Sequence, residues 1–379
     1  MSIGVTRWSE VSLGEVCEFK YGRSLAEAAR VGGTVPVFGS NGIVGCHDEA
    51  LTSGPAIVIG RKGSFGEINF SPTPCWPIDT TYYVDSTATK ADLRWLAYRL
   101  ASLGLNRLNR AAAVPGLNRD DAYRQRLLLP PLPEQRRIAE VLDRAEALRA
   151  KRRAALARLD TLTQAIFLGM FGDLAARGWS MGTIADIAAP GDGSIRTGPF
   201  GSQLLHSEFT DSGIAVLGID NVVANEFRWE ERRFISETKY RHLRRYTVRP
   251  GDVLITIMGT CGRCAVVPND VPTAINTKHL CCITTDQTKC LPTFLHAYFL
   301  RHPLAEKYLR TAAKGAIMAG LNMGIIEAMP IPLPPIDLQC DFASRVATIG
   351  RVKAGYRASL AELDTLFASL QHRAFRGEL

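Results

Sequence analysis

Hydrophobic positions follow their most regular pattern in two long segments of the chain. From Ile138 to Ile166, and again from Phe342 to Leu370, apolar side chains recur mostly at spacings of three and four residues. This heptad pattern is typical of helices that pack along a narrow apolar face. Each pattern predicts a helix of about 33 residues, and the two have the same phase at an offset of 204 residues. The predicted seam consists of Ile138, Ala145, Leu148, Leu159, Leu162 and Ile166 in the first helix, and of Ile349, Val352, Tyr356, Leu363, Leu366 and Leu370 in the second.

The simplest way to bury two such faces is to pack them against each other. We therefore predict that the helices form an antiparallel coiled coil. The alternative is that each helix packs against its own globular part.

Outside these helices, short β-branched runs are separated by Gly, Asn, Asp and Pro, which is typical of short strands. Shorter helical segments are expected at residues 91–103 and 292–309. The fold class is therefore α+β, with two mixed α/β domains. The predicted strands cover residues 35–38, 56–59, 82–84, 214–217, 253–257 and 280–283.

The chain also contains an internal repeat. Gly116-Leu117-Asn118 returns as Gly320-Leu321-Asn322, and the Pro-Pro pairs at 130–131 and 334–335 follow at the same offset of 204 residues. Residues 56–66 resemble residues 252–262, and the second copy is longer, mostly between residues 198 and 249. The repeat predicts two globular domains, at residues 1–131 and 174–335, and two helical segments, at residues 132–173 and 336–379.

Composition adds a preference for an anionic partner. The formal net charge is +8 and the pI is about 9.1, while the mean hydropathy is +0.00. No apolar run approaches the roughly 20 residues of a membrane helix, and no signal peptide is visible. Nine cysteines in such a chain indicate reduced thiols. We expect a cytoplasmic protein with no membrane association.

Catalytic signatures are weak. The sequence contains no phosphate-binding loop, nucleophile elbow, His-Glu-x-x-His or Asn-Pro-Pro-aromatic motif. A group of cysteines favours core packing over a zinc site, because the first copy has no thiols at the matching positions. A loose acid-acid-lysine pattern is the only hint of a magnesium-dependent nuclease. These two groups are Cys261, Cys264, Cys281 and Cys282, and Asp220, Glu237 and Lys239.

Several of these segments resemble one family. Residues 130–139 (Pro-Pro-Leu-Pro-Glu-Gln-Arg-Arg-Ile-Ala) are similar to the stop-and-helix signature of the specificity subunits of type I restriction-modification systems. Residues 165–173 and 366–379 resemble the same family, so the resemblance spans the whole chain. The sequence departs from it at residues 336–339, where Ile-Asp-Leu-Gln replaces Leu-Pro-Glu-Gln, so the second methyltransferase contact is expected to differ in detail.

The resemblance implies a DNA-reading subunit without catalysis of its own. Each target recognition domain would read one half of a bipartite, asymmetric site in double-stranded DNA, and the paired helices would set the spacer between the halves. Two methyltransferase subunits and two motor-nuclease subunits would be its partners. The cofactors S-adenosylmethionine, ATP and Mg²⁺ would belong to those partners, with no cofactor or metal in this chain.

Candidate DNA contacts lie in loops with exposed donors and cations. For each loop the alternative is a solvated turn. Gly116, Leu117, Asn118, Gly320, Leu321 and Asn322 either dock the methyltransferase or brace each domain on its helix, and Arg110, Arg119 and Lys314 nearby are further phosphate candidates. The DNA-binding set is Tyr21, Arg23, Ser40, Asn41, Arg61, Lys62, Ser64 and Phe65, supported by Thr80, Thr81 and Tyr82, in the first copy, and Arg196, Thr197, Phe200, Ser202, Asn221, Thr260, Arg263, Asn276, Lys278 and His279 in the second.

Two other functions remain open at this stage. A stand-alone nuclease would cleave DNA with magnesium and no partner. A coiled-coil scaffold would show no DNA affinity that depends on salt or sequence.

Overall fold

The computed structural model describes residues 8–108, 116–173, 177–229, 231–314 and 320–379. They form two compact units, which we describe separately. The first unit comprises Met1–Ala154 and Arg357–Leu379, and the second comprises Ala155–Tyr356. Each unit therefore combines a globular part with a segment of each long helix.

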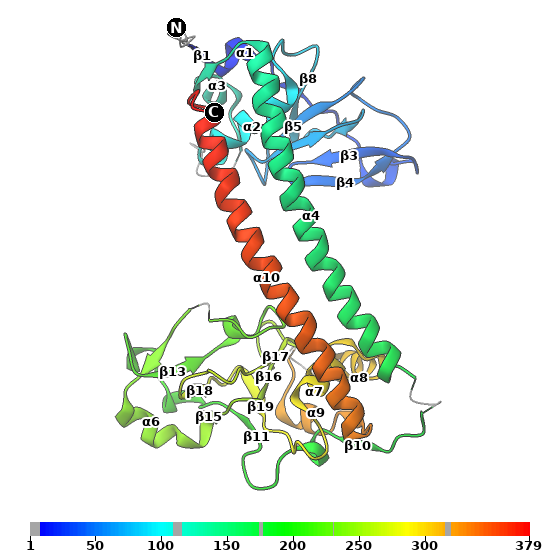
Figure 1. Cartoon of the computed structure of the whole chain (residues 1–379), viewed down its shortest axis with the longest axis vertical. Helices are drawn as coiled ribbons and strands as arrows, with labels where there is room; N and C mark the ends of the chain where they lie inside the picture. Colours follow the sequence, from blue (N-terminus) through cyan, green and yellow to red (C-terminus); the bar gives the residue numbers. More distant parts are fainter. Residues whose placement is uncertain (1–7, 109–115, 174–176, 230, 315–319) are drawn as a thin grey trace. The chain divides into compact units, whose positions relative to one another are not determined.

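Short strands and helices build the globular part of the first unit (Figure 1). The strands are β1 (Ser9–Ser12), β2 (Lys20–Tyr21), β3 (Val35–Gly39), β4 (Gly42–His47), β5 (Ala56–Gly60), β6 (Ile68–Ser71), β7 (Trp76–Pro77), β8 (Thr81–Asp85) and β9 (Arg126–Leu129), and the helices are α1 (Leu13–Val16), α2 (Leu93–Ser102) and α3 (Arg119–Tyr123). An antiparallel sheet has the order β2-β8-β5-β6, while β4-β3-β7 contains a parallel pair, β3 with β7. β1 pairs with β9.

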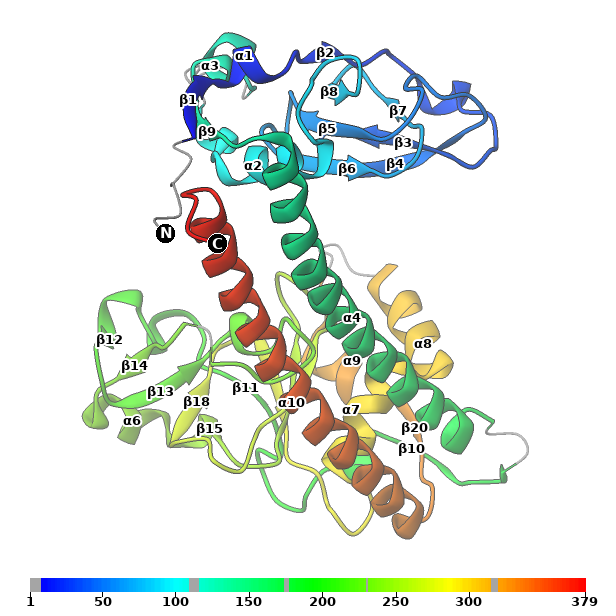
Figure 2. The same cartoon turned by 45° about the horizontal axis from the view of Figure 1, so that its top comes forward.

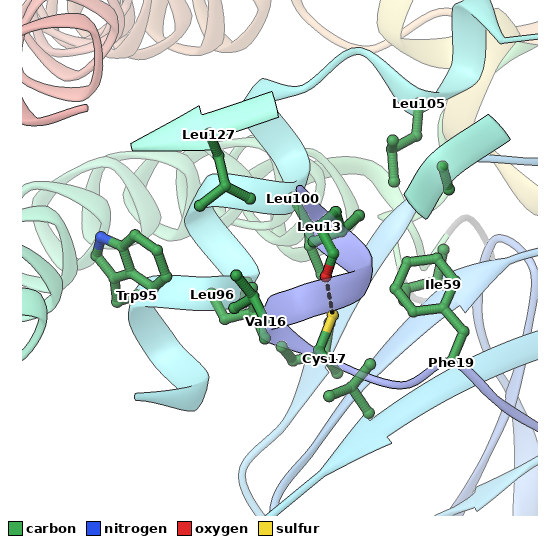
Figure 3. Close-up of a cluster of buried hydrophobic side chains, with 14 of the residues drawn as sticks. Leu13, Val16, Cys17, Phe19, Ile59, Trp95, Leu96, Leu100, Leu105 and Leu127 are labelled. Carbon is green, nitrogen blue, oxygen red and sulfur yellow. Dashed lines mark hydrogen bonds between the residues drawn. The ribbon is translucent and has the colours of Figure 1, made fainter. Parts of the chain in front are cut away.

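The core of this unit lies between the antiparallel sheet and the short helices. Figure 3 shows Trp95 and Leu96 of α2 packed near Val16 of α1, with Ile59 of β5 in the same cluster. Trp95, Leu96 and Ile59 are fully buried. Each such side chain stabilises the fold by about 1.5–3 kcal/mol relative to exposure. Asp92 begins α2 as its N-cap, because its carboxylate accepts a hydrogen bond from the Trp95 amide at 2.9 Å.

The second unit repeats this plan with additions. Its strands are β10 (Met181–Thr183), β11 (Ile195–Thr197), β12 (Phe209–Thr210), β13 (Ile214–Leu217), β14 (Phe234–Ile235), β15 (Thr247–Val248), β16 (Val253–Thr256), β17 (Cys264–Val266), β18 (Ala274–Asn276), β19 (Leu280–Ile283) and β20 (Pro330–Pro332), and its helices are α6 (Glu237–Leu243), α7 (Pro292–Arg301), α8 (Pro303–Lys314) and α9 (Met323–Glu327). The antiparallel sheet is β11-β19-β16-β17, and the sheet with the parallel pair has five strands, β12-β14-β13-β18-β15. β10 pairs with β20.

Two long helices complete both units: α4 (Leu132–Phe171) and α10 (Ile336–Ala374). They are longer than the predicted 33 residues. Figure 2 shows them side by side. In the first unit Arg149 of α4 hydrogen-bonds to Asp364 of α10 at 2.6 Å, and Arg137 to the carbonyl of Leu379 at 2.9 Å, so the helices run antiparallel there.

In the second unit the same antiparallel order holds. Asp160 pairs with Lys353, and the Phe167 ring lies 5.5 Å from the Phe342 ring, centroid to centroid. The pairing of the helices was therefore predicted correctly. The helices also pack on the globular parts, since Ile138 of α4 belongs to the core of the first one, and Phe167 and Phe342 share a core with Phe294 of α7 in the second.

Four residues predicted for the seam lie outside it. Leu148, Leu162, Val352 and Leu366 are 52%, 46%, 42% and 49% exposed. In each case the next residue along the chain is the less exposed one, namely Arg149, Thr163, Lys353 and Phe367. The remaining predicted seam residues are buried or partly buried.

At two of these four positions, Arg149 and Lys353, a charged residue occupies the seam. The Arg149 side chain is only 18% exposed, and its guanidinium lies 4.4 Å from the Phe367 ring centroid. The Lys353 side chain is 12% exposed. Long aliphatic stems can cover an apolar seam while their charged ends reach carboxylates at its edge. A heptad pattern that considers only apolar residues therefore misses Arg149 and Lys353.

The repeated glutamines explain how the helices begin. Gln135 of α4 is buried, accepts from the Asp92 amide at 2.8 Å and donates to the Pro130 carbonyl at 2.8 Å. Gln339 of α10 makes the matching bonds to the Leu291 amide, at 2.8 Å, and to the Pro334 carbonyl, at 3.0 Å. Each glutamine thus ties the start of a long helix to the N-cap of α2 or α7.

The remaining elements follow the prediction closely. All six predicted strands are present within one or two residues. The helix expected at 292–309 is instead two helices, α7 and α8, because Pro303 has no amide hydrogen to continue the first. None of the described helices is both long enough and apolar enough to cross a membrane.

Candidate nucleic-acid interface

A glycine hairpin follows β5 in the first unit. The Gly66 amide donates to the Gly60 carbonyl at 2.8 Å, and the Phe65 amide to the Gly63 carbonyl at 2.8 Å. Gly63 and Gly66 have φ angles of +70° and +76°, a region that favours glycine. This backbone leaves Lys62 and Ser64 exposed and Arg61 partly exposed.

The carbonyl of Thr80 brings three of the predicted loops together. It accepts hydrogen bonds from the amides of Arg61 and Lys62, at 2.9 and 3.1 Å, and from the Ser40 hydroxyl, at 2.7 Å. The loop after β2 reaches the same place, because the Gly22 amide donates to the Thr81 carbonyl at 3.1 Å. A Cβ at Gly22 would lie 2.1 Å from the Ile78 carbonyl oxygen, so the approach requires glycine.

Tyr21 is the exposed centre of a cation–aromatic cluster. The residue is 55% exposed, and the guanidinium carbons of Arg61 and Arg119 each lie 5.4 Å from its ring centroid. Arg61 is also held by the Asp79 carbonyl, which accepts from its Nη2 at 2.6 Å. An exposed aromatic ring can stack on a nucleic-acid base, and the two cations beside it can bind phosphate groups. The cluster therefore suits a nucleic acid.

The second unit has the same backbone frame. The Gly262 amide donates to the Thr256 carbonyl at 2.9 Å, and Gly259 and Gly262 have φ angles of +70° and +80°. The Ile257 amide donates to the His279 carbonyl at 2.9 Å, as the Arg61 amide does to Thr80. Ile257 therefore stands where the first unit has Arg61, and His279 stands where it has Thr80.

The Gly-Leu-Asn motifs close both hairpins. The amides of Leu117 and Leu321 donate to the carbonyls of Arg61 and Ile257, at 2.9 and 3.1 Å. The next residue in each motif caps a short helix: the Asn118 side chain accepts from the Asp120 amide, and the Asn322 side chain from the Ile325 amide. These hydrogen bonds tie each motif to the hairpin of its own domain, and the Leu117 and Leu321 side chains lie in the same hydrophobic cores as Ile138 of α4 and Phe342 of α10. Docking of a methyltransferase at these motifs stays a prediction. Arg110 and the side chain of Lys314 lie outside the described residues.

The side chains on this common frame differ between the units. The positions of Arg61, Lys62 and Arg119 in the first unit correspond to Ile257, Met258 and Met323 in the second. Ile257 is buried, whereas Met258 and Met323 are 38% and 36% exposed. The first surface is therefore cationic and aromatic, and the second is more apolar.

Most predicted DNA-binding residues lie on the surface. The exposed residues are Tyr21, Arg23, Asn41, Lys62, Ser64, Phe200, Ser202, Thr260 and Arg263, and the partly exposed ones are Ser40, Arg61, Phe65, Thr80, Thr197, Lys278 and His279. Their contact with DNA stays a prediction. Arg244 and Arg245 were not among the predicted DNA contacts, although residues 241–249 contain four arginines, a pattern that indicates a basic surface.

Five of the predicted residues are buried: Thr81, Tyr82, Arg196, Asn221 and Asn276. Direct DNA contact does not fit their positions. Arg196 is an ion-pair partner of Asp252, with 2.6 Å between Nη2 and Oδ2. Asn221 accepts from the Gly218 amide at 2.9 Å, and Asn276 donates to the Leu280 carbonyl at 3.0 Å. These side chains hold the loops in shape.

The two weak catalytic signals have other partners in the structure. Asp220 pairs with Arg233, and Lys239 pairs with Glu208 at 2.7 Å. Burial raises the pKa of Cys281 to about 12, so its thiol stays protonated. Among the described residues no three His, Cys, Asp or Glu side chains are grouped to hold a metal.

Comparison with known proteins agrees with this geometry. The sequence profile of the type I restriction modification DNA specificity domain matches residues 6–158 and 204–355. The specificity subunit of the type I restriction enzyme EcoBI from Escherichia coli is 25% identical over 354 residues, which cover 85% of this chain and 73% of that protein.

Two solved structures share the fold. One is the S subunit of a type I restriction-modification system from M. genitalium, with a TM-score of 0.62 and 14% identity over 99% of this chain and 98% of that chain. The other comes from a study of complex assembly in the type I R-M system, with a TM-score of 0.54 and 18% identity over 99% of both chains. The duplicated domain, the paired helices and the matched profile lead to one conclusion: this chain belongs to the family of type I restriction-modification specificity subunits.

Proposed function

We propose that each unit reads one half of a bipartite, asymmetric DNA site through the surface around its glycine hairpin. The observation that carries this proposal is the shared hairpin frame with different side chains. Arg61 and Lys62 suit guanine acceptors or phosphates, whereas Met258 and Met323 suit apolar contact with a thymine methyl group. Because the two hairpin surfaces differ in chemistry, we expect them to bind half-sites of different DNA sequence.

The helix pair is the proposed spacer and docking element. α4 and α10 contain 40 and 39 residues, or about 60 Å of helix each. One turn of B-DNA spans about 34 Å, so helices of this length suit readers on separate turns. Leu148, Leu162, Val352 and Leu366 are exposed, and their positions repeat after 204 residues. They give two methyltransferase subunits matching apolar surfaces.

Catalysis then resides in the partners. We propose two methyltransferase subunits that use S-adenosylmethionine, and two motor-nuclease subunits that use ATP and Mg²⁺. This chain supplies sequence recognition, which agrees with the separate pairing of Asp220 and Lys239. A stand-alone nuclease would need those side chains at one site.

Mapping methylated adenines in the source genome, with and without this gene, tests the proposal. We expect one bipartite motif to lose methylation when the gene is removed.

Deleting one facing heptad from both helices should then shorten the gap between the half-sites and leave the half-site sequences unchanged. A heptad deleted from α4 alone is the control, because it breaks the pairing register. An unchanged gap in the double deletion would contradict the spacer role, and unchanged methylation without the gene would contradict the whole proposal.

A further inference from the structure

We propose that the segment formed by α6 and the 3-10 turn η7 (Arg244–Tyr246) is a second phosphate-binding surface, which holds the DNA backbone beside the half-site of the second unit. The inference rests on the proposed function. It adds a site outside the repeated hairpin frame and assigns it to double-stranded DNA.

The segment has no counterpart among the described residues of the first unit. There the sheet with the parallel pair ends at β7, whereas in the second unit β15 is added at the edge of the equivalent strand, β18. α6 and η7 lead directly into β15. The addition lies in the stretch by which the second copy is longer, between residues 198 and 249.

The addition places arginines beside the loops already assigned to DNA. Thr247 of β15 is paired with Ile275 of the antiparallel β18, so η7 lies next to the end of β18, where the turn with Lys278 and His279 begins. Gln203, in the loop after β11, accepts from the Tyr246 hydroxyl at 2.8 Å and from Arg245 at 3.5 Å. η7 thus joins two predicted DNA loops into one surface.

The charge of this surface is available to a ligand. Arg244 and Arg245 are exposed, and among the described residues neither has a carboxylate partner. Their guanidinium groups lie 6.0 Å and 4.6 Å from the ring centroids of Tyr240 and Tyr246. Aromatic support of this kind limits the freedom of the side chains. The Nη2 atom of Arg245 donates to Gln203 and to the Tyr246 hydroxyl, and the other N–H groups of Arg244 and Arg245 can donate to phosphate oxygens.

This surface also complements the second hairpin, which keeps the exposed cation Arg263 but differs from the first hairpin at three other positions. Where the first unit has Arg61, Lys62 and Arg119, the second has apolar side chains, so it lacks those phosphate contacts. Arg244 and Arg245 restore positive charge from a neighbouring element. The apolar side chains of the hairpin can then contact base edges, while η7 adds to the phosphate affinity that Arg263 supplies.

The test is the salt dependence of DNA binding by the full-length chain, purified with the subunits that accompany it. The duplex carries the target found by methylation mapping, and a scrambled duplex of equal length is the second probe. We expect R244Q/R245Q to change how the DNA association constant depends on salt. The slope of its logarithm against the logarithm of the salt concentration should become shallower by about 1 to 2, since each phosphate contact contributes about 0.9. Affinity near 0.1 M salt should fall roughly tenfold per lost contact, by the same factor on both duplexes.

Matched variants separate this role from general charge and from misfolding. K307Q/R310Q removes two exposed cations from α8 of the same unit and should leave the slope unchanged. R244K/R245K keeps the charge and should retain most of the affinity. R244Q alone removes only the contact with Tyr240, so folding is preserved. An unchanged slope in R244Q/R245Q, or an equal loss in K307Q/R310Q, would overturn the proposal. Salt-insensitive binding by the unsubstituted chain would overturn the proposed function instead.

Discussion

Replacing Arg196 by Met should destabilise the second unit, although the sequence pattern placed this arginine in a DNA-binding loop. The substitution keeps an unbranched side chain of similar length and removes the charge. Arg196 is 9% exposed and Asp252 is 1% exposed. Without the guanidinium, a buried carboxylate stays unpaired in a low-dielectric interior.

The magnitude follows from the contacts that are lost. Arg196 donates to Asp252 and to the Thr247 carbonyl, each at 2.6 Å, and to the Thr284 hydroxyl at 3.0 Å. Removing one partner of a buried ion pair costs about 3–5 kcal/mol. We therefore expect the free energy of unfolding of the second unit to fall by about that amount. The double variant R196M/D252N should recover part of the loss, because no buried charge then remains.

Hydrogen exchange of the β16 and β19 amides, followed by mass spectrometry, measures this unit separately from the first. Protection should decrease by roughly two to four orders of magnitude, at about 1.4 kcal/mol for each factor of ten. R263Q is the matched control, because Arg263 is exposed in the hairpin of the same unit. It should weaken DNA binding and leave protection unchanged. Weaker DNA binding with normal protection in R196M would refute the assignment of Arg196 to the core.

Three further outcomes are expected. Asn118→Ala should lower the free energy of unfolding of the first unit by about 1 kcal/mol through loss of the helix cap, whereas Asn118→Asp should not, as thermal denaturation can show. Leu148→Lys should leave helix content and melting temperature unchanged, whereas Phe167→Ala should cost about 3–5 kcal/mol, since only Phe167 is buried. Burial and the neighbouring Lys278 and Arg233 lower the pKa of His279, so it is neutral at pH 7. DNA affinity should rise as the pH falls through this lowered pKa, below the ordinary imidazole value of about 6.5, and His279→Asn should abolish that rise in a binding titration.

Periodicity and repetition predicted the architecture because both reflect burial. The strands at residues 56–59 and 280–283 are fully buried in the antiparallel sheets, and both long helices are present. The hydrophobic pattern could not predict the exact seam residues, because Arg149 and Lys353 lie in the seam and bury their aliphatic stems there. Hydropathy assigns one value to a residue, whereas the stem and the charged end of these residues lie in different environments.

The candidate interface was only partly predictable for a related reason. The glycine hairpins could be located, because Gly63 and Gly259 mark positions where the backbone needs a positive φ angle. Which polar residue of a loop is exposed depends on tertiary partners far away in sequence. Asn221 and Asn41 both lie in predicted loops, yet Asn221 is fully buried and bound to the Arg228 carbonyl, while Asn41 is exposed.

The two hairpins keep the same backbone frame although the side chains on it differ, and in the proposed function this difference changes what each domain binds. The hydrogen bonds that set the frame use backbone atoms: the Leu117 and Leu321 amides donate to equivalent carbonyls, and those carbonyls belong to Arg61 in one unit and Ile257 in the other. Because the bonds do not depend on the side chain of the acceptor residue, that side chain can change from a cation to an apolar group at little cost in stability. Specificity and stability are thus carried by different atoms of the same residues. If η7 binds phosphate as proposed, it adds affinity from an inserted element that lies beside the frame and is not part of it.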